Sequence, residues 1–160
     1  METMQQPTVK HSSFTLERSV PTSPDRVFSA FSDPAKKIRW HADGRNSEVI
    51  AFEMDFRVGG TELHRYRFKD GTPFPGVELK NDWIYQEIVQ NRLVVSANAM
   101  DLGGKRISAS LVTIELLPTE TGTDLICTHQ GAFFENSGGP EMREAGWRSL
   151  FDKLAAELAK

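Results

Sequence analysis

The chain has 160 residues, with 19 Lys and Arg against 22 Asp and Glu, so its formal net charge is −3. This length, with 39% hydrophobic residues, suits one globular domain that has its own core. The charge balance does not favour nucleic-acid binding, which needs clustered positive charge, and no apolar run approaches the ~20 residues of a membrane span. The single cysteine, Cys127, excludes an intrachain disulfide and a multi-cysteine metal site.

The N-terminal segment, residues 1–12, is polar and aperiodic. We expect it to form a flexible arm that precedes a single domain over residues 13–160. Because the segment lacks the apolar region of a secretory signal, a cytoplasmic location is the default expectation.

The next elements are a strand and two short helices. Residues Phe14–Val20 alternate apolar and polar side chains, which predicts a strand. Two helix-start signals follow, Ser23-Pro24-Asp25 with Ser23 as the cap and Asp33-Pro34. The second helix is expected to end near Trp40.

From about Asn46 the hydrophobic period changes to two, which predicts a series of strands joined by tight turns. The prolines and glycines between Asp70 and Gly76 predict a loop. Beyond a hairpin at Val58-Gly59-Gly60, the expected strands lie at about residues 83–89, 92–101, 106–117 and 124–132. In the first of these, the pattern does not decide whether Trp83 or Ile84 faces the interior.

A long amphipathic helix is predicted after Pro140. Its apolar stripe consists of Trp147, Leu150, Phe151, Leu154, Ala155 and Leu158. Its charged side, expected to face solvent, consists of Arg143, Glu144, Arg148, Asp152, Lys153 and Glu157. Gly146, which has no Cβ, would let this helix approach the sheet closely.

Short connections imply antiparallel neighbours, so the pattern predicts an α+β fold. A curved antiparallel sheet of about six or seven strands would wrap around the C-terminal helix, whose stripe covers its apolar face. A sheet of this kind leaves a cavity beside the helix, which we expect the short helices and the loop at Thr72–Val77 to roof.

The order of elements and several short motifs resemble the START/SRPBCC helix-grip superfamily. Within it, the chain is similar to the family of the C-terminal domain of the heat-shock-protein-90 ATPase activator. The motifs that carry the resemblance are Asp33-Pro34 with Trp40, Asp55–Gly60, Tyr85–Val89 followed by Arg92–Val94, Gly122–Leu125 leading to Thr128–Gly131, and Gly146-Trp147 with Leu150, Leu154 and Leu158. The resemblance implies a hydrophobic ligand cavity, whereas the chemistry varies across the superfamily.

Four polar residues are candidates for orienting a ligand in this cavity. Glu62, His64 and Tyr66 alternate along one strand and therefore share a face, and His129 in the last strand could add a second imidazole. Such groups can hold a polar head or transfer protons. The competing interpretations are that Glu62 and His64 face solvent or satisfy each other. A metal site of Glu62, His64 and His129 is not selected by their spacing, so no metal or cofactor is expected.

The aromatic candidates for the cavity wall are Trp40, Phe52, Phe133, Trp147 and Phe151, together with Phe134. Ordinary core packing is the alternative interpretation for each of them. Cys127 fits an inert small hydrophobe better than a nucleophile.

The leading hypothesis is a protein that binds a hydrophobic or amphipathic small molecule. The alternatives are an acid–base enzyme of the cyclase, dehydratase or hydrolase type, and a chaperone-associated interaction module. No pattern in the sequence establishes a chaperone or a homodimer partner, and none indicates a nucleic-acid partner or membrane insertion.

Overall fold

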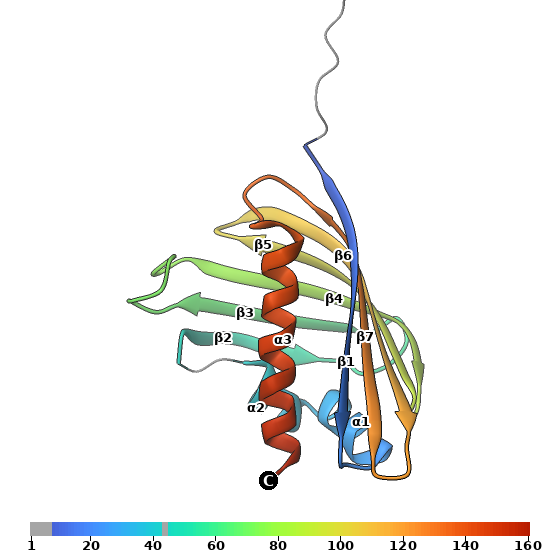
Figure 1. Cartoon of the computed structure of the whole chain (residues 1–160). Helices are drawn as coiled ribbons and strands as arrows, with labels where there is room; N and C mark the ends of the chain where they lie inside the picture. Colours follow the sequence, from blue (N-terminus) through green and yellow to red (C-terminus); the bar gives the residue numbers. More distant parts are fainter. Residues whose placement is uncertain (1–7, 43–44) are drawn as a thin grey trace, which may run out of the picture.

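The described part of the chain, residues 8–42 and 45–160 of a computed structural model, forms one seven-stranded antiparallel sheet and three helices (Figure 1). The strands are β1 (Lys10–Val20), β2 (Ser47–Met54), β3 (Thr61–Phe68), β4 (Glu78–Val89), β5 (Leu93–Leu102), β6 (Lys105–Pro118) and β7 (Thr123–Phe133). The helices are α1 (Pro24–Ser32), α2 (Pro34–His41) and α3 (Gly139–Leu158). The predicted α+β fold is confirmed.

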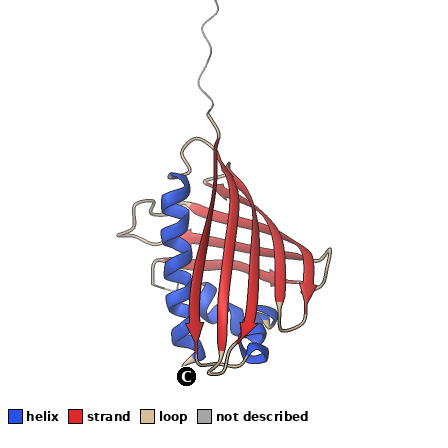
Figure 2. Cartoon of the chain, turned by 45° about the vertical axis from the view of Figure 1, so that its right-hand side comes forward, coloured by secondary structure: helices blue, strands red, loops and turns tan. Residues whose placement is uncertain are grey.

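The strands are ordered β1-β7-β6-β5-β4-β3-β2, so each strand from β2 to β7 lies beside its neighbour in sequence. β1 pairs with β7 at the other edge, with Phe14 opposite His129. The segment that holds α1 and α2 therefore carries the chain from one edge of the sheet to the other. Figure 2 shows the sheet curving, with all three helices on its concave side.

The two short helices begin at their prolines, as the sequence predicts. Asp33 caps α2 by accepting the N–H of Ala35 at 2.9 Å. Ser23 occupies the N-cap position of α1 as expected, but its side chain accepts no hydrogen bond from the helix. The buried face of α1 consists of Val27, Phe28, Ala30 and Phe31.

Two strands begin earlier than the hydrophobic pattern predicts. β1 starts at Lys10, opposite Phe133 of β7, so residues 10–12 of the expected arm belong to the sheet, while residues 1–7 lie outside the described residues. β4 starts at Glu78 rather than near Trp83. In both cases the ladder hydrogen bonds to a neighbouring strand extend a polar segment that has little strand pattern of its own.

β4 also explains why its inward face could not be read from the sequence. The register shifts between Tyr85 and Glu87, which indicates a β-bulge. Before the shift Trp83 and Tyr85 are buried and Ile84 is 47% exposed. After it, Ile88 packs against the core while Val89 is 44% exposed.

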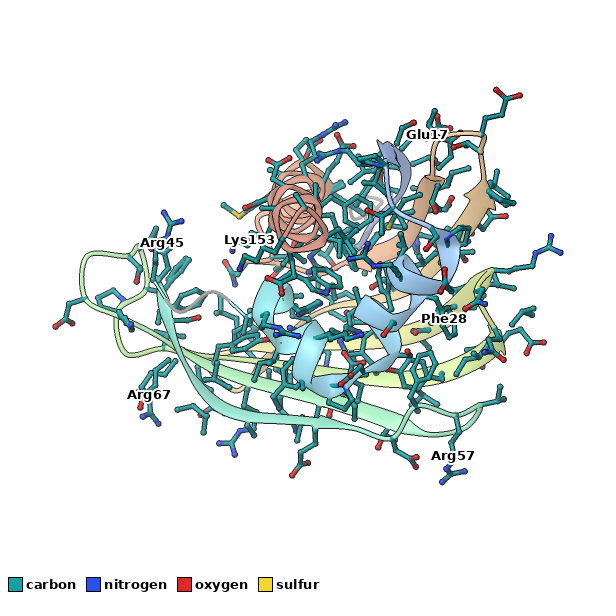
Figure 3. All side chains as sticks on the ribbon, turned by 90° about the horizontal axis from the view of Figure 1, so that it is seen from below. Glu17, Phe28, Arg45, Arg57, Arg67 and Lys153 are labelled. Atoms are coloured by element: carbon teal, nitrogen blue, oxygen red, sulfur yellow. The ribbon has the colours of Figure 1, made fainter. Side chains whose placement is uncertain are left out.

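The solid core lies beneath the C-terminal half of α3. Phe151 and Leu154 are buried there with Leu16, and the helix packs against α1, α2, β1 and β7. Figure 3 looks along α3 and shows the charged residues Glu17, Arg57 and Arg67 at the outside of the molecule. Within the described residues, no helix is both long and apolar enough to cross a bilayer.

Candidate functional site

A cavity of about 390 Å³ separates the N-terminal half of α3 from the sheet. Strands β3 to β7 form its floor and α3 forms its opposite wall. Its lining is mostly apolar and consists of His41, Tyr66, Phe68, Phe74, Leu79, Asn81, Trp83, Asn98, Met100, Leu102, Ile107, His129, Ser137, Met142, Arg143, Gly146, Trp147 and Leu150. This volume lies within the range of small-molecule sites, about 300–1,000 Å³.

Two exposed apolar side chains line the cavity and mark its mouth. Phe74 in the loop between β3 and β4 is 47% exposed, and Met142 on α3 is 63% exposed. The predicted roof is therefore correct in part, because the loop contributes Phe74 but the short helices contribute only His41 among the described lining residues. The solvent-facing side of the cavity therefore lies between this loop and α3.

Two glycines shape the site in ways that the sequence did not reveal. The expectation that Gly146 permits close packing is wrong, because a Cβ there would meet no atom within 4 Å and the residue borders the cavity. Gly131 in β7 is the crowded position. A Cβ there would lie 2.9 Å from the rings of both His129 and Phe133, so the glycine lets these two rings sit over the strand.

Arg143 extends into the cavity rather than into solvent, so its expected place on the charged side of the helix is wrong. Its guanidinium donates to Ser108 Oγ at 2.7 Å and lies 3.1 Å from Met100 Sδ. The guanidinium carbon lies 5.3 Å from the centre of the Phe133 ring. Burial lowers the pKa of Arg143 to about 10. The sequence held a signal for this placement, because Arg143 lies four residues before Trp147 and residues at this spacing share one helix face.

His129 lies between two aromatic rings. It stacks on Phe14 at 4.8 Å between ring centres and on Phe133 at 5.8 Å. Burial, together with the positive charge of Arg143, lowers the pKa of His129 to about 4, so the imidazole is neutral at pH 7. Within the described residues, its Nδ1 atom and the Nε1 atom of Trp83 have no hydrogen-bond partner. Both residues line the cavity.

A buried ionic cluster, made of Lys37, Glu62, His64 and Tyr85, lies deeper in the molecule. Lys37 Nζ is 2.8 Å from both carboxylate oxygens of Glu62. His64 Nε2 is 2.5 Å from Glu62 Oε2, and the Tyr85 hydroxyl donates to Oε1. Burial acts to raise the pKa of Glu62, but Lys37 and His64 outweigh it and hold that pKa well below its usual range. Glu62 and His64 thus lie in close ionic contact inside the molecule rather than facing solvent, while His64 Nδ1 has no hydrogen-bond partner among the described residues.

His41, which is not among the residues predicted from the sequence, connects the ionic cluster to the cavity. Its ring centre lies 4.5 Å from that of His64, and its Nδ1 atom is 3.5 Å from the Tyr66 hydroxyl. Burial lowers the pKa of His41, and the nearby His64 and Lys37 lower it further. Its position four residues after Lys37, on the same face of α2, was the available signal.

The structure divides the nine predicted site residues into three groups. Tyr66, His129 and Trp147 line the cavity. Trp40 and Glu62, again with Trp147, border a second void of about 30 Å³. Phe52, His64, Phe133 and Phe151 line neither void: Phe52 stacks on His64 at 4.6 Å, Phe133 lies beneath Arg143, and Phe151 belongs to the core. A ligand role for any of the nine stays a prediction.

The remaining candidates concern metal and thiol chemistry. Across residues 8–42 and 45–160, no three His, Cys, Asp or Glu side chains come together as metal ligands. Cys127 is fully buried, and burial raises the pKa of its thiol to about 12. It therefore behaves as a small hydrophobe, because the thiolate is the reactive form.

Comparisons with known proteins agree with this architecture. The family model of Activator of Hsp90 ATPase homolog 1-like proteins matches residues 21–159. A solved structure from Rhizobium loti is 44% identical, with a TM-score of 0.83 over 94% of this chain and 99% of the other. An uncharacterised protein from Rhizobium leguminosarum is 31% identical, with a TM-score of 0.87 over 94% and 96%. No curated protein matches the chain.

A more distant solved structure is similar to this chain in its fold only. The AHSA1-like protein from Aeromonas hydrophila is 20% identical, with a TM-score of 0.68 over 92% of each chain. The family match covers the short helices, strands β2 to β7 and α3, and so includes every element that lines the cavity. The resemblance inferred from the sequence motifs is confirmed, and the chain belongs to the Activator of Hsp90 ATPase homolog 1-like family.

Proposed function

We propose that the protein binds a hydrophobic or amphipathic small molecule in the cavity between α3 and the sheet. The observation that carries this proposal is an apolar space of about 390 Å³ whose wall also holds isolated polar groups. Burying apolar surface there supplies affinity at about 25 cal/mol per Å² before ordering costs. Trp83 Nε1 and His129 Nδ1, which have no hydrogen-bond partner among the described residues, would fix the orientation of the ligand, because each can hydrogen-bond to a polar atom of the ligand.

The alternatives have less support. Acid–base catalysis would need a titratable pair facing the ligand, but the described residues give His129 no carboxylate partner, and the ionic cluster holds Glu62 and His64 outside the lining of the cavity. The family name refers to a chaperone activator, but no particular surface of the described residues favours such a partner. A cytoplasmic location stays an expectation.

Thermal unfolding tests the proposal directly. The protein is heated with a panel of medium-chain fatty acids, fatty alcohols and planar aromatic acids. At a ligand concentration about 100-fold above Kd, binding adds about 2.7 kcal/mol of stability. For a domain of this size, that gain raises Tm by about 5–10 °C.

A cavity-filling variant makes the test specific to this space. Gly146→Leu places a side chain where a Cβ meets no atom within 4 Å. Displacing even two methylene groups of a ligand costs about 1.6 kcal/mol, which is about tenfold in affinity. Ala145→Leu adds the same side chain at the neighbouring exposed position and should leave affinity unchanged. Equal affinity of the two variants, or no Tm shift with any compound, would contradict the proposal.

A further inference from the structure

Arg143 is a partly buried cation, and no described residue supplies a counter-charge. Within the described residues, no carboxylate lies within ion-pair distance of its guanidinium, and its side-chain contacts are Ser108, Met100 and Phe133. Removing a charge from water is costly unless the charge is paired, so this arrangement destabilises the protein without ligand. The ionic cluster shows the contrast, because there Lys37 contacts the Glu62 carboxylate at 2.8 Å.

The groups around Arg143 form a site for an anion. Ser108 is fully buried and accepts from Arg143 with its oxygen, which leaves its own O–H proton free to donate. His129 lines the same cavity with an unpartnered Nδ1. A guanidinium presents several N–H donors in one plane, a geometry that matches a carboxylate. The rest of the cavity lining is mostly apolar, and Trp83, Trp147 and Leu150 are among its bulky members.

We propose that the ligand is an amphipathic carboxylic acid whose carboxylate binds Arg143 and the Ser108 hydroxyl while its apolar part contacts Trp83, Trp147 and Leu150. The inference rests on the proposed function and adds the chemical class of the ligand. A single cation with a neutral imidazole nearby matches a monoanion better than a dianionic phosphate. At about 30 Å³ for each water-sized group, the cavity holds roughly a dozen non-hydrogen atoms. Decanoate is a suitable probe of this size.

The test compares decanoate with 1-decanol, which has a similar chain but no charge. Binding is followed by tryptophan fluorescence, because Trp83 and Trp147 line the cavity. We expect decanoate to bind the wild-type protein about 10- to 100-fold more tightly than 1-decanol does, because a charge-assisted hydrogen bond contributes this gain in affinity. Arg143→Met should remove this preference while leaving decanol affinity nearly unchanged. Arg143→Lys, which keeps the charge but not the planar fork, should retain part of it.

Arg148→Met is the matched control, because it removes an arginine from the exposed side of the same helix, where Arg148 pairs with Glu144. This variant should keep the full preference for decanoate. The wild-type comparison needs no variant, so it stays decisive even if Arg143→Met does not fold. Equal binding of decanoate and decanol, or equal loss in the Arg148 variant, overturns the carboxylate site while leaving ligand binding intact. Absence of binding by both compounds and by the wider panel overturns the proposed function as well.

Discussion

The C-terminal half of α3 packs into a solid core, whereas its N-terminal half borders the cavity. Phe151 and Leu154 are 2% and 1% exposed, while Met142 is 63% exposed and Gly146 faces open space. This difference in packing is encoded in the sequence of the helix, because its run of large apolar residues begins only at Trp147. One half of this helix therefore packs into the core, and the other half borders the cavity.

The ionic cluster and the cavity also differ in how they hold buried charge, and this difference gives the largest predicted effect. Glu62→Gln leaves the Lys37 cation, 12% exposed in its side chain, without its carboxylate. Breaking a buried pair in this way should cost about 3–5 kcal/mol of unfolding free energy. Urea unfolding at neutral pH measures this cost. Glu144→Gln, which breaks an exposed pair with Arg148, is the control and should cost less than about 1 kcal/mol.

Removing the charge of Arg143 in the cavity should affect stability much less than Glu62→Gln does. Arg143→Met removes a charge that has no carboxylate partner, so the lost hydrogen bond to Ser108 is offset by relief of the burial cost. We expect a change of no more than about 1 kcal/mol. A loss as large as that of Glu62→Gln would show that Arg143 is structural.

Truncating α3 at two positions tests the packing difference directly. Leu154→Ala should cost about 2–5 kcal/mol, because it opens a void in a closed core. Leu150→Ala, one turn earlier, should cost about 1 kcal/mol or less, because this half-buried side chain already faces an empty space. Equal costs in denaturant titrations would mean that the two halves are packed alike.

Acidification should weaken the fold before the exposed carboxylates titrate. His129 has a pKa of about 4 in the folded chain against an ordinary value of 6.5, and burial lowers the pKa of His41 and His64 as well. The unfolded chain therefore binds more protons in this range, so stability is full above about pH 6.5 and falls as the pH drops toward 4. His129 alone should account for ~2–3 kcal/mol of the loss.

A histidine variant checks the source of this pH dependence. His129→Gln should flatten the slope of unfolding free energy against pH between about pH 6.5 and 4.5. His11→Gln alters an exposed histidine on β1 and should leave the slope unchanged. An unchanged slope in the His129 variant would assign the dependence to His41 and His64, whose pKa values burial also lowers.

The smallest predicted effect separates the two glycines of the site. Gly146→Ala should raise stability by about 0.5–1 kcal/mol, since alanine is the better helix former and its Cβ meets no neighbour. Gly131→Ala should lower stability, because its Cβ would lie 2.9 Å from the His129 and Phe133 rings. Paired thermal melts measure both changes, and a gain at Gly131 would refute the packing described for β7.

Much of the fold follows from periodicity. The alternation of Glu62, His64 and Tyr66 correctly placed all three on one face of β3, which the structure shows to be the inner face. The apolar stripe of α3 correctly predicted burial of Trp147 and Leu154. The start of β4 was missed because pairing with β3 and β5, rather than its own polar residues, holds it in the sheet.

The site was less predictable, because its members come from elements that only the fold brings together. Lys37 on α2 reaches Glu62 on β3, a contact that no local pattern encodes. Arg143 was placed in solvent because charge outweighed helical spacing in the sequence analysis, although four residues separate it from Trp147. Buried charges are rare enough that this preference is sound on most helices and fails here.

The three tryptophan indoles provide the most direct test of the central claim that the N-terminal half of α3 borders a ligand cavity. Trp83 and Trp147 line the cavity, whereas the Trp40 N–H donates to the Ala30 carbonyl at 2.9 Å in the packed region. In ¹H–¹⁵N spectra recorded during a decanoate titration, the indole signals of Trp83 and Trp147 should move and that of Trp40 should stay. Movement of the Trp40 signal alone, or of none at saturating decanoate, would contradict the account.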